Sequence, residues 1–491
     1  MEKSETQMSS LYQRPIKRVL LLMPPINPVE LDGNLAPYES VSAPAGLCYI
    51  AALLRKEAYS VSILDATAEG LGIQSTVERI IAAEPDIVGV SCHTSWVFTA
   101  HEVMKRVKAA MPRVCTVAGG PHVTAIPERT LEDFPFFDVL VVGEGEITFR
   151  SLIEAINDGT PFRQVNGIAF REDGRNVLNP PRERIKNLDE LPPPAYDLLP
   201  KLTKYYWPYY NNIRGKNGFS IIVSRGCPYK CNFCDNGVFG NLFTKHSPEY
   251  VVDLIEDLVR NHGVGYLVFD DDNLLLNKNY LLSILELMKK RHLNLPFTCA
   301  SRVDTIDEER LEKLRDAGCK LIMFGMESGS QKILSSMNKK TTTDQIRHAV
   351  ALTKQYNIDV LGYFILGYPG ETEATMQETV DFVKRLKLDD IAVQPFVPFP
   401  GAPVYRTALE EGTYEEDWRE VGTFTKVIYE PYGLTNEIIV EYLNKCIDAC
   451  YNNLRTYLRA YRRVYSFNHF KILMNFAFRR DPLWTTGSPD D

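Results

Sequence analysis

Residues 224–236 read SRGCPYKCNFCDN and follow directly on an apolar run at 219–223. The stretch places Cys227, Cys231 and Cys234 with three and then two residues between them. Three thiolates can hold three irons of a four-iron cluster and leave the fourth iron open. A structural zinc site needs a fourth ligand and usually a second pair of closely spaced cysteines, and the sequence has no second C-x2-C pair. The spacing therefore favours a 4Fe-4S cluster at the end of a strand.

Strand and helix patterns alternate on both sides of this stretch, across residues 216–402. The expected strands are SIIVSR, YLVFDDD, FTCASR, KLIMFGME, DVLGYFILG and IAVQPFVPF. Helical periodicity connects them, for example at 248–261 and 278–291. Six strand-helix units predict a partial (β/α)6 barrel of the TIM type. In such a barrel the loops after the strands carry the chemistry.

A second alternating series occupies residues 17–158. Its apolar runs are RVLLLMPP, SVSILDA, DIVGVSC, RVCTVAGG and DVLVVGEG, with helices expected at 45–56, 75–83 and 99–111. This pattern predicts a five-stranded, doubly wound, Rossmann-like α/β domain.

The rest of the chain is expected to connect and extend these two domains. We expect a disordered tail at 1–16, a hairpin and a proline-rich linker within 159–215, and a helical C-terminal region at 403–491.

The cysteine stretch resembles the hallmark of the radical S-adenosylmethionine (SAM) superfamily, and the resemblance covers about residues 216–400. In that family the open iron binds SAM, and one electron cleaves it to a 5′-deoxyadenosyl radical. The resemblance implies that Phe233 lies near the adenine. It also implies a SAM contact from Glu327, in the segment GMESGS that contains Gly325 and Ser328. Arg302, at the end of FTCASR, is expected either to pair with the SAM carboxylate or to form a structural ion pair.

One segment of the predicted barrel departs from the family pattern. FDDDN at 269–273 stands where many relatives carry a Gly-Gly-Glu-like segment. The contact to the SAM amino group therefore has no assigned residue in this sequence.

The front domain contains AGGPHVT and VVGEGE, which together with the segment SAPAGLCYIAALLR resemble the cobalamin-binding domain of one large branch of radical SAM enzymes. The resemblance implies a doubly wound domain that places small residues beside the nucleotide tail of cobalamin. The candidates are Ser91, Gly119 and Gly120. Gly143 and Glu144 are expected either to line the cofactor cavity or to lie at a solvated edge. The segment after the first strand lacks the histidine that ligates cobalt in Asp-x-His-x-x-Gly proteins.

With both cofactors, the resemblance implies methylation of an unactivated carbon, less often of phosphorus, in a small-molecule or lipid-like metabolite. Such an enzyme needs an external low-potential electron donor. A cobalamin-dependent cyclase or ring-rearranging enzyme is the alternative, and the motifs do not separate the two. A methylthiotransferase acting on transfer RNA is less favoured because no basic RNA-binding C-terminal barrel is evident. A cobalamin sensor without enzymatic activity would have no use for the three cysteines.

Charge and hydropathy restrict the partners. The formal net charge of −8 gives no global attraction to nucleic acid. The first apolar run, 19–23, is too short for a signal segment or a membrane span, so the cytoplasm is the expected compartment. Residues 455–480 carry seven basic and no acidic residues beside tyrosines at every fourth position from 457 to 465. We expect this helix to pack its tyrosines on the barrel. Contact with a membrane surface, or with an anionic or lipid-like substrate, is the less favoured alternative.

Overall fold

The computed structural model describes residues 15–26, 41–206, 216–414, 416–419, 421 and 426–451. They form two compact units. Of these residues, the first unit contains 15–26, 43–205 and 235–244, and the second contains 41–42, 206, 216–234 and the described residues from 245 onward. The tail expected at the N-terminus (except for residues 15 and 16) and the basic helix expected at 455–480 lie outside the described residues.

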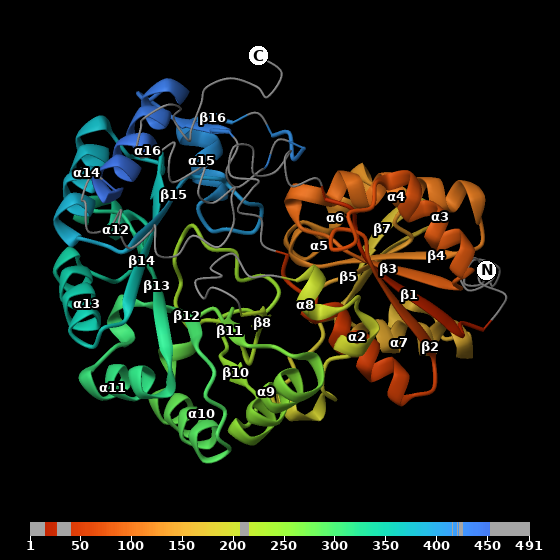
Figure 1. The fold of residues 1–491 in the computed structure, drawn as a ribbon. Coiled ribbons are helices and arrows are strands. Elements are labelled where there is room, and N and C mark those ends of the chain that lie inside the picture. The colour runs from red at the N-terminus through yellow and green to blue at the C-terminus, as the bar shows by residue number, and fades with distance from the viewer. Residues whose placement is uncertain are drawn as a thin grey trace. The chain divides into compact units, whose positions relative to one another are not determined.

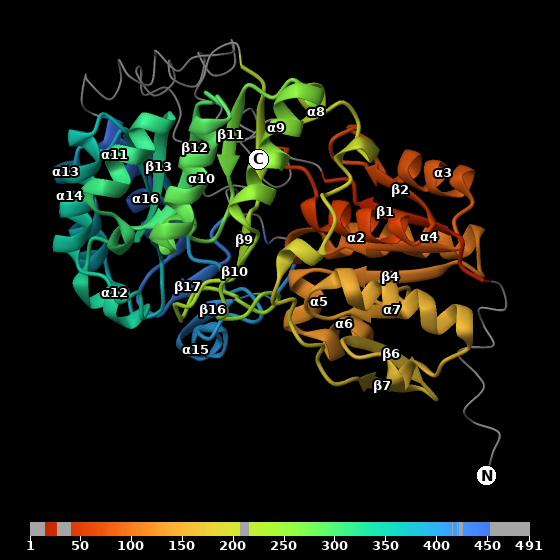
Figure 2. The same cartoon turned by 90° about the horizontal axis from the view of Figure 1, so that it is seen from below.

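The first unit is built on a sheet whose strand order is β2-β1-β3-β4-β5-β6-β7. Its first five strands are parallel, and they are β1 (Arg18–Met23), β2 (Ser60–Asp65), β3 (Ile87–Ser91), β4 (Cys115–Gly119) and β5 (Val139–Val141). The helices are α2 (Ala45–Lys56), α3 (Ile73–Ala83), α4 (Val97–Ala110), α5 (Pro121–Ala125), α6 (Pro127–Asp133), α7 (Gly145–Asp158) and α8 (Leu202–Tyr205). Helices α2 and α7 contact each other, as do α3 and α4, and the two pairs cover opposite faces of the sheet (Figures 1 and 2). The predicted doubly wound domain is confirmed.

The sheet has two more strands than the sequence predicts. The hairpin of β6 (Ile168–Glu172) and β7 (Arg175–Leu178) pairs antiparallel with β5 instead of standing apart in the linker. Ile168, Ala169 and Phe170 are fully buried, so the apolar half of β6 covers the otherwise open edge of β5. Asp173 and Gly174, both with positive φ, form the two-residue turn.

The second unit is a curled parallel sheet of the order β15-β14-β13-β12-β11-β8. Its strands are β8 (Gly218–Ile221), β11 (Tyr266–Phe269), β12 (Phe297–Arg302), β13 (Cys319–Glu327), β14 (Asp359–Leu366) and β15 (Asp390–Pro395). The covering helices are α9 (Pro248–His262), α10 (Lys278–Lys290), α11 (Glu308–Ala317), α13 (Thr343–Gln355) and α14 (Glu373–Leu386), on the outer side of the sheet (Figure 1). The predicted partial barrel is confirmed.

Shorter elements complete the second unit. They are β9 (Ser224–Arg225), which pairs with β10 (Thr244–Lys245), and α12 (Gln331–Ser336), α15 (Tyr405–Glu411), β16 (Gly412–Tyr414), β17 (Tyr429–Pro431) and α16 (Asn436–Tyr451). The region after residue 403 is therefore not uniformly helical as expected. Strands β16 and β17 pair antiparallel, and this places the fully buried Tyr429 against Phe396. Among the described residues, no helix has the length and apolarity needed to span a membrane.

Candidate functional site

The three cysteines lie on the loop that connects β9 to β10. The start of this loop is held by carboxylates that follow β11. Asp271 Oδ1 accepts hydrogen bonds from the N–H groups of Val223 at 3.1 Å and Ser224 at 2.5 Å, and Asp272 Oδ2 accepts one from the N–H of Gly226 at 3.0 Å. Burial raises the pKa of Asp271 to about 7. The acidic segment that departs from the family pattern thus fixes the backbone leading into Cys227.

The middle of the loop is held by the segment that follows α12. The N–H of Asn232 donates to Met337 O at 2.9 Å, and its side-chain amide donates to Ser336 O at 2.8 Å. In the opposite direction, Asn338 Nδ2 donates to Lys230 O at 2.5 Å. Asn338 has φ +52°, a conformation that asparagine tolerates better than most residues. The sequence analysis missed this support, because nothing local connects residues about a hundred positions apart.

Arg302 lies against Cys231 at the end of β12. Its Nη1 is 3.7 Å from Cys231 Sγ, and its Nε and Nη2 each lie 2.9 Å from an oxygen of Asp304. Nη2 also donates to Lys339 O at 2.8 Å, and the guanidinium lies 3.6 Å from the centre of the Tyr229 ring. Of the two expectations for Arg302, the structure contains the ion pair. Burial raises the pKa of the Cys231 thiol, while the charges of Lys339 and Arg302 act in the opposite direction.

Glu327 forms a buried ion pair that the sequence analysis did not anticipate. Its Oε1 is 2.6 Å from Nζ of Lys339, and both side chains are less than a tenth exposed. Lys339 Nζ also lies 5.6 Å from the centre of the Phe233 ring, so the pair is next to the cysteine loop. Glu327 has φ +65° and lies where the register of β13 against β14 shifts. This irregularity turns its carboxylate toward Lys339.

Gly325 lies directly against the same ion pair. A Cβ at this position would lie 2.5 Å from Glu327 Oε1 and 2.9 Å from Lys339 Nζ. Protein interiors are too closely packed to absorb such an overlap without displacing one partner. The glycine of the GMESGS segment therefore leaves room for the charge pair, and its expected contact with SAM stays a prediction.

Phe233 and Ser328 have protein neighbours in the structure. Phe233 packs against a buried apolar cluster that includes Ile333, Tyr368 and Phe396. Ser328 is fully buried, with its hydroxyl 3.2 Å from Thr379 Oγ1 and accepting a hydrogen bond from the N–H of Ser330. Their predicted contacts with SAM stay predictions, and Ser328 has a clear role in fixing the loop after β13.

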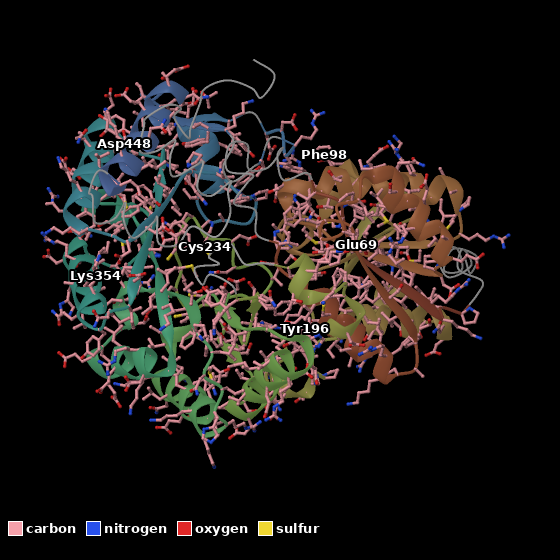
Figure 3. The ribbon with its side chains drawn as sticks, viewed as in Figure 1. Glu69, Phe98, Tyr196, Cys234, Lys354 and Asp448 are labelled. Carbon is pink, nitrogen blue, oxygen red and sulfur yellow. The ribbon has the colours of Figure 1, made fainter. Side chains whose placement is uncertain are left out.

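The donor set of the cysteine loop fits a three-thiolate cluster. Cys227, Cys231 and Cys234 lie on one loop, and Cys227 and Cys234 are partly exposed. Cys234 lies on the side of the curled sheet that the helices leave uncovered, whereas Lys354 lies among the covering helices (Figure 3). No group of three or more His, Cys, Asp or Glu side chains within the described residues is arranged to hold a single metal ion.

The switch point of the first unit's sheet is the place where a ligand crevice is expected. The strand order reverses between β1 and β3, and ligands of doubly wound sheets bind beyond the carboxyl ends of the strands at such a point. Ser91 and Gly119 are neighbours in register at the ends of β3 and β4. A Cβ on Gly143 would meet nothing within 4 Å. These small residues leave the open space that a nucleotide tail needs, so the residues present fit cobalamin.

Gly120 has a structural reason for its small size beside the predicted one. Its φ is +115°, and a Cβ there would lie 2.7 Å from the carbonyl oxygen of Cys92. The residue is thus a glycine because the β4-α5 turn packs on the backbone at the end of β3. The predicted contact of Gly120 with cobalamin stays a prediction, and Gly119 is the better probe of the slot, because its Cβ would make only ordinary contacts.

Glu144 is engaged with protein groups. Its Oε2 accepts a hydrogen bond from the N–H of Ile185 at 2.9 Å and lies 3.5 Å from Arg184 Nε. Arg184 in turn donates to Phe239 O, to Leu242 O at 2.6 Å and to Thr244 Oγ1 at 3.1 Å. The carboxylate therefore orients an arginine that holds segment 235–244, and its predicted contact with cobalamin remains untested.

Two family matches cover the two units. Residues 221–383 match the Radical SAM superfamily, and residues 32–153 match the B12 binding domain. The chain is similar to an uncharacterized methyltransferase of Pyrococcus horikoshii, with 33% identity over 89% of this chain and 93% of that protein. It is also similar to the anaerobic magnesium-protoporphyrin IX monomethyl ester cyclase of Rubrivivax gelatinosus, with 30% identity over 74% of this chain and 66% of that protein.

A solved structure shares the fold. The radical SAM methyltransferase TsrM from Kitasatospora setae, with cobalamin and a 4Fe-4S cluster bound, superimposes with a TM-score of 0.71. The match covers 94% of this chain and 100% of that chain at 19% sequence identity. The arrangement of a B12-binding unit and a radical SAM unit in one chain is therefore a known architecture.

Proposed function

The chain belongs to the cobalamin-dependent radical SAM enzymes, and from that membership we propose that it is a methyltransferase acting on an unactivated carbon, or less often on phosphorus, of a small molecule. The observation that carries the proposal is the similarity to a methyltransferase along nearly the full length of both chains. The similarity spans both the front unit and the barrel. This supports binding of both the methyl donor and the radical source by one chain.

When bound, the cluster with SAM supplies the radical that removes a hydrogen atom, and cobalamin supplies the methyl group. The chain's own residues hold these groups in place. Cys227, Cys231 and Cys234 are the proposed ligands of the cluster. Asp271 stabilises the backbone that leads into these ligands through hydrogen bonds to Val223 and Ser224.

On the cobalamin side, Ser91, Gly119 and Gly143 form the proposed slot. They lie at or just after the carboxyl ends of three neighbouring parallel strands. Each small side chain keeps the edge of the sheet accessible to a bulky ligand. Gly119 lies in the middle of the slot, because β4 is the middle one of these three strands. A Cβ there would make only ordinary contacts, the nearest at 3.5 Å from Val141.

The cyclase is the second candidate function, because a cyclase relative matches at 30% identity. A methyltransferase must reload cobalamin with a methyl group from a second SAM. A cyclase has no such requirement. Transfer of label from SAM to cobalamin therefore separates the two candidates before the substrate is known.

The test is anaerobic incubation of the reconstituted enzyme with reduced cobalamin and SAM that carries a deuterated methyl group. We expect S-adenosylhomocysteine in amounts that match the labelled methyl recovered with cobalamin. Cys231→Ala should abolish formation of 5′-deoxyadenosine and leave methyl transfer to cobalamin unchanged. Gly119→Leu should do the reverse, since a packed slot does not absorb four extra carbons. Deoxyadenosine without any S-adenosylhomocysteine in the wild-type enzyme would favour the cyclase.

The remaining partners follow from this chemistry. The substrate is a small molecule, and a lipid-like one is the narrower form of the proposal. The enzyme needs an external low-potential electron donor, and the cytoplasm supplies the reducing conditions that free thiols and a cluster require. Mass analysis of products formed from candidate metabolites with the deuterated SAM identifies the substrate. The absence of any labelled product from a wide panel would count against a small-molecule substrate.

A further inference from the structure

Arg302 is a charged side chain that lies against a proposed cluster ligand. It is buried, with 5% of its surface exposed, and its Nη1 is 3.7 Å from Cys231 Sγ. An arginine has five N–H donors in a fixed planar fork. In Arg302, Nε and Nη2 donate to Asp304, Nη2 also donates to Lys339 O, and Nη1 points at the sulfur. Four of the five donors are thus committed, and one of them is committed to Cys231.

Three contacts fix the orientation of this guanidinium. The bidentate ion pair with Asp304 sets its plane, and Lys339 O accepts on one edge. The ring of Tyr229 lies 3.6 Å from the guanidinium carbon. Tyr229 is two residues from Cys231 in the cysteine loop, so the loop itself contributes to the stack. The geometry therefore keeps one positive charge beside one sulfur.

We propose that Arg302 tunes the reduction potential of the cluster through its contact with Cys231, and that Asp304 sets the size of this effect as the counter-charge. The inference rests on the proposed cluster ligation by Cys231. Reduction adds one electron to the cluster and makes it more negative. A fixed positive charge near a ligand sulfur stabilises the reduced form and raises the potential.

The two charges of the ion pair should shift the cluster potential in opposite directions, so each can be tested by removing one of them. Arg302 lies against the sulfur, and Asp304 contacts the far edge of the guanidinium. Removal of the positive charge should therefore lower the cluster potential. Removal of the Asp304 charge should raise it, because the arginine then acts without its counter-charge.

The experiment is a potentiometric titration of the reconstituted full-length protein, followed by the electron paramagnetic resonance signal of the reduced cluster. The variants are Arg302→Gln, Arg302→Lys and Asp304→Asn. The matched control is Arg291→Gln, which also removes one positive charge. Arg291 forms its ion pairs at the end of α10 that precedes β12, at the opposite end of the strands from Arg302. Its charge is partly exposed to solvent and is therefore screened by salt.

At the wild-type midpoint potential, half of the wild-type clusters are reduced. At that potential, Arg302→Gln should lower the ratio of reduced to oxidised cluster at least tenfold, which corresponds to a midpoint shift of 59 mV for one electron. Asp304→Asn should raise the ratio, Arg302→Lys should keep it within about threefold because the charge remains, and Arg291→Gln should leave it unchanged. An unchanged ratio in Arg302→Gln, or shifts of the same sign in Arg302→Gln and Asp304→Asn, would overturn the inference.

Iron content separates this inference from the proposed function. A wild-type protein that holds no iron after reconstitution would refute both, since neither survives without the cluster. If the wild-type protein holds the cluster and cleaves SAM, but the Arg302 and Asp304 variants have the same cluster potential as the wild type, only the tuning is refuted. Where Arg302→Gln loses the cluster by misfolding, Asp304→Asn still decides, because a potential at or below the wild-type value contradicts the predicted rise.

Discussion

Replacement of Gly120 by alanine tests why the turn after β4 contains a glycine. Gly120 has φ +115° and ψ −173°, a backbone region that is nearly exclusive to glycine and costs other residues about 1–3 kcal/mol. The new Cβ would also lie 2.7 Å from Cys92 O and 3.1 Å from Cys92 N. Relief of such an overlap costs about 1–3 kcal/mol more. We therefore expect the first unit to lose about 2–6 kcal/mol of unfolding free energy, less up to about 1 kcal/mol from the stiffer unfolded chain.

The neighbouring Gly119→Ala is the matched control. Gly119 has no positive φ, and its Cβ would meet Val141 no closer than 3.5 Å, an ordinary contact. This substitution adds the same methyl group one residue away without strain. It should change the unfolding free energy by about 1 kcal/mol or less, with a stabilising sign where the unfolded-chain effect dominates.

Urea unfolding followed by far-ultraviolet circular dichroism measures the difference. With a slope of about 2 kcal/mol per molar urea, Gly120→Ala should lower the midpoint of the first unit's transition by about 1–3 M. Gly119→Ala should leave it nearly unchanged. Equal midpoints for the two variants would refute the packing argument. A Gly120→Ala protein of wild-type stability that takes up less cobalamin would instead support the predicted contact of this glycine with the cofactor.

Two further predictions concern Glu371 and Arg184. Burial raises the pKa of Glu371 to about 8 from its usual 4.5. Between these two values the folded state holds a proton that the unfolded chain has released. The contribution of this group to the unfolding free energy is therefore fully present below about pH 4.5 and is lost as pH rises toward 8. Glu371→Gln should flatten this decline in urea midpoints between pH 5 and 8, and an unchanged slope would contradict the assignment. Arg184→Met removes the donors to Phe239 O, Leu242 O and Thr244 Oγ1, each worth about 1.5–3 kcal/mol, so amide exchange in 235–244 should accelerate at least tenfold. Arg163→Met, which removes an exposed pair with Glu172, is its control, and equal exchange rates in the two proteins would show that Arg184 does not hold the segment.

The strands were predictable because parallel strands are buried on both faces and read as apolar runs. Helix α2 coincides with the range expected from periodicity, 45–56. The hairpin of β6 and β7 was also expected, but its pairing with β5 was not. That pairing depends on which edge of a folded sheet lies nearby, and a local pattern contains no such information.

The site likewise contains residues that the local sequence predicts and residues that it does not. The spacing of Cys227, Cys231 and Cys234 identifies a cluster loop because all three ligands are close in sequence. The partner of Glu327 was not predictable, since Lys339 arrives through α12 and the turn at Asn338. Asp304 lies only two residues from Arg302, yet the choice between SAM and Asp304 depends on side-chain direction. Local spacing therefore predicts ligands better than it predicts their supporting charges.

The hold of Arg184 on segment 235–244 restricts how this enzyme can be taken apart or recombined. The first unit is not one continuous stretch of chain, because it needs a piece that follows Cys234 in the sequence. A fragment that stops at residue 205 would leave Arg184 without the carbonyls of Phe239 and Leu242. Exchange of the front domain with that of a relative would therefore have to transfer the ten residues 235–244 as well. A recombinant protein joined only at the proline linker would therefore separate residues 235–244 from the rest of the first unit.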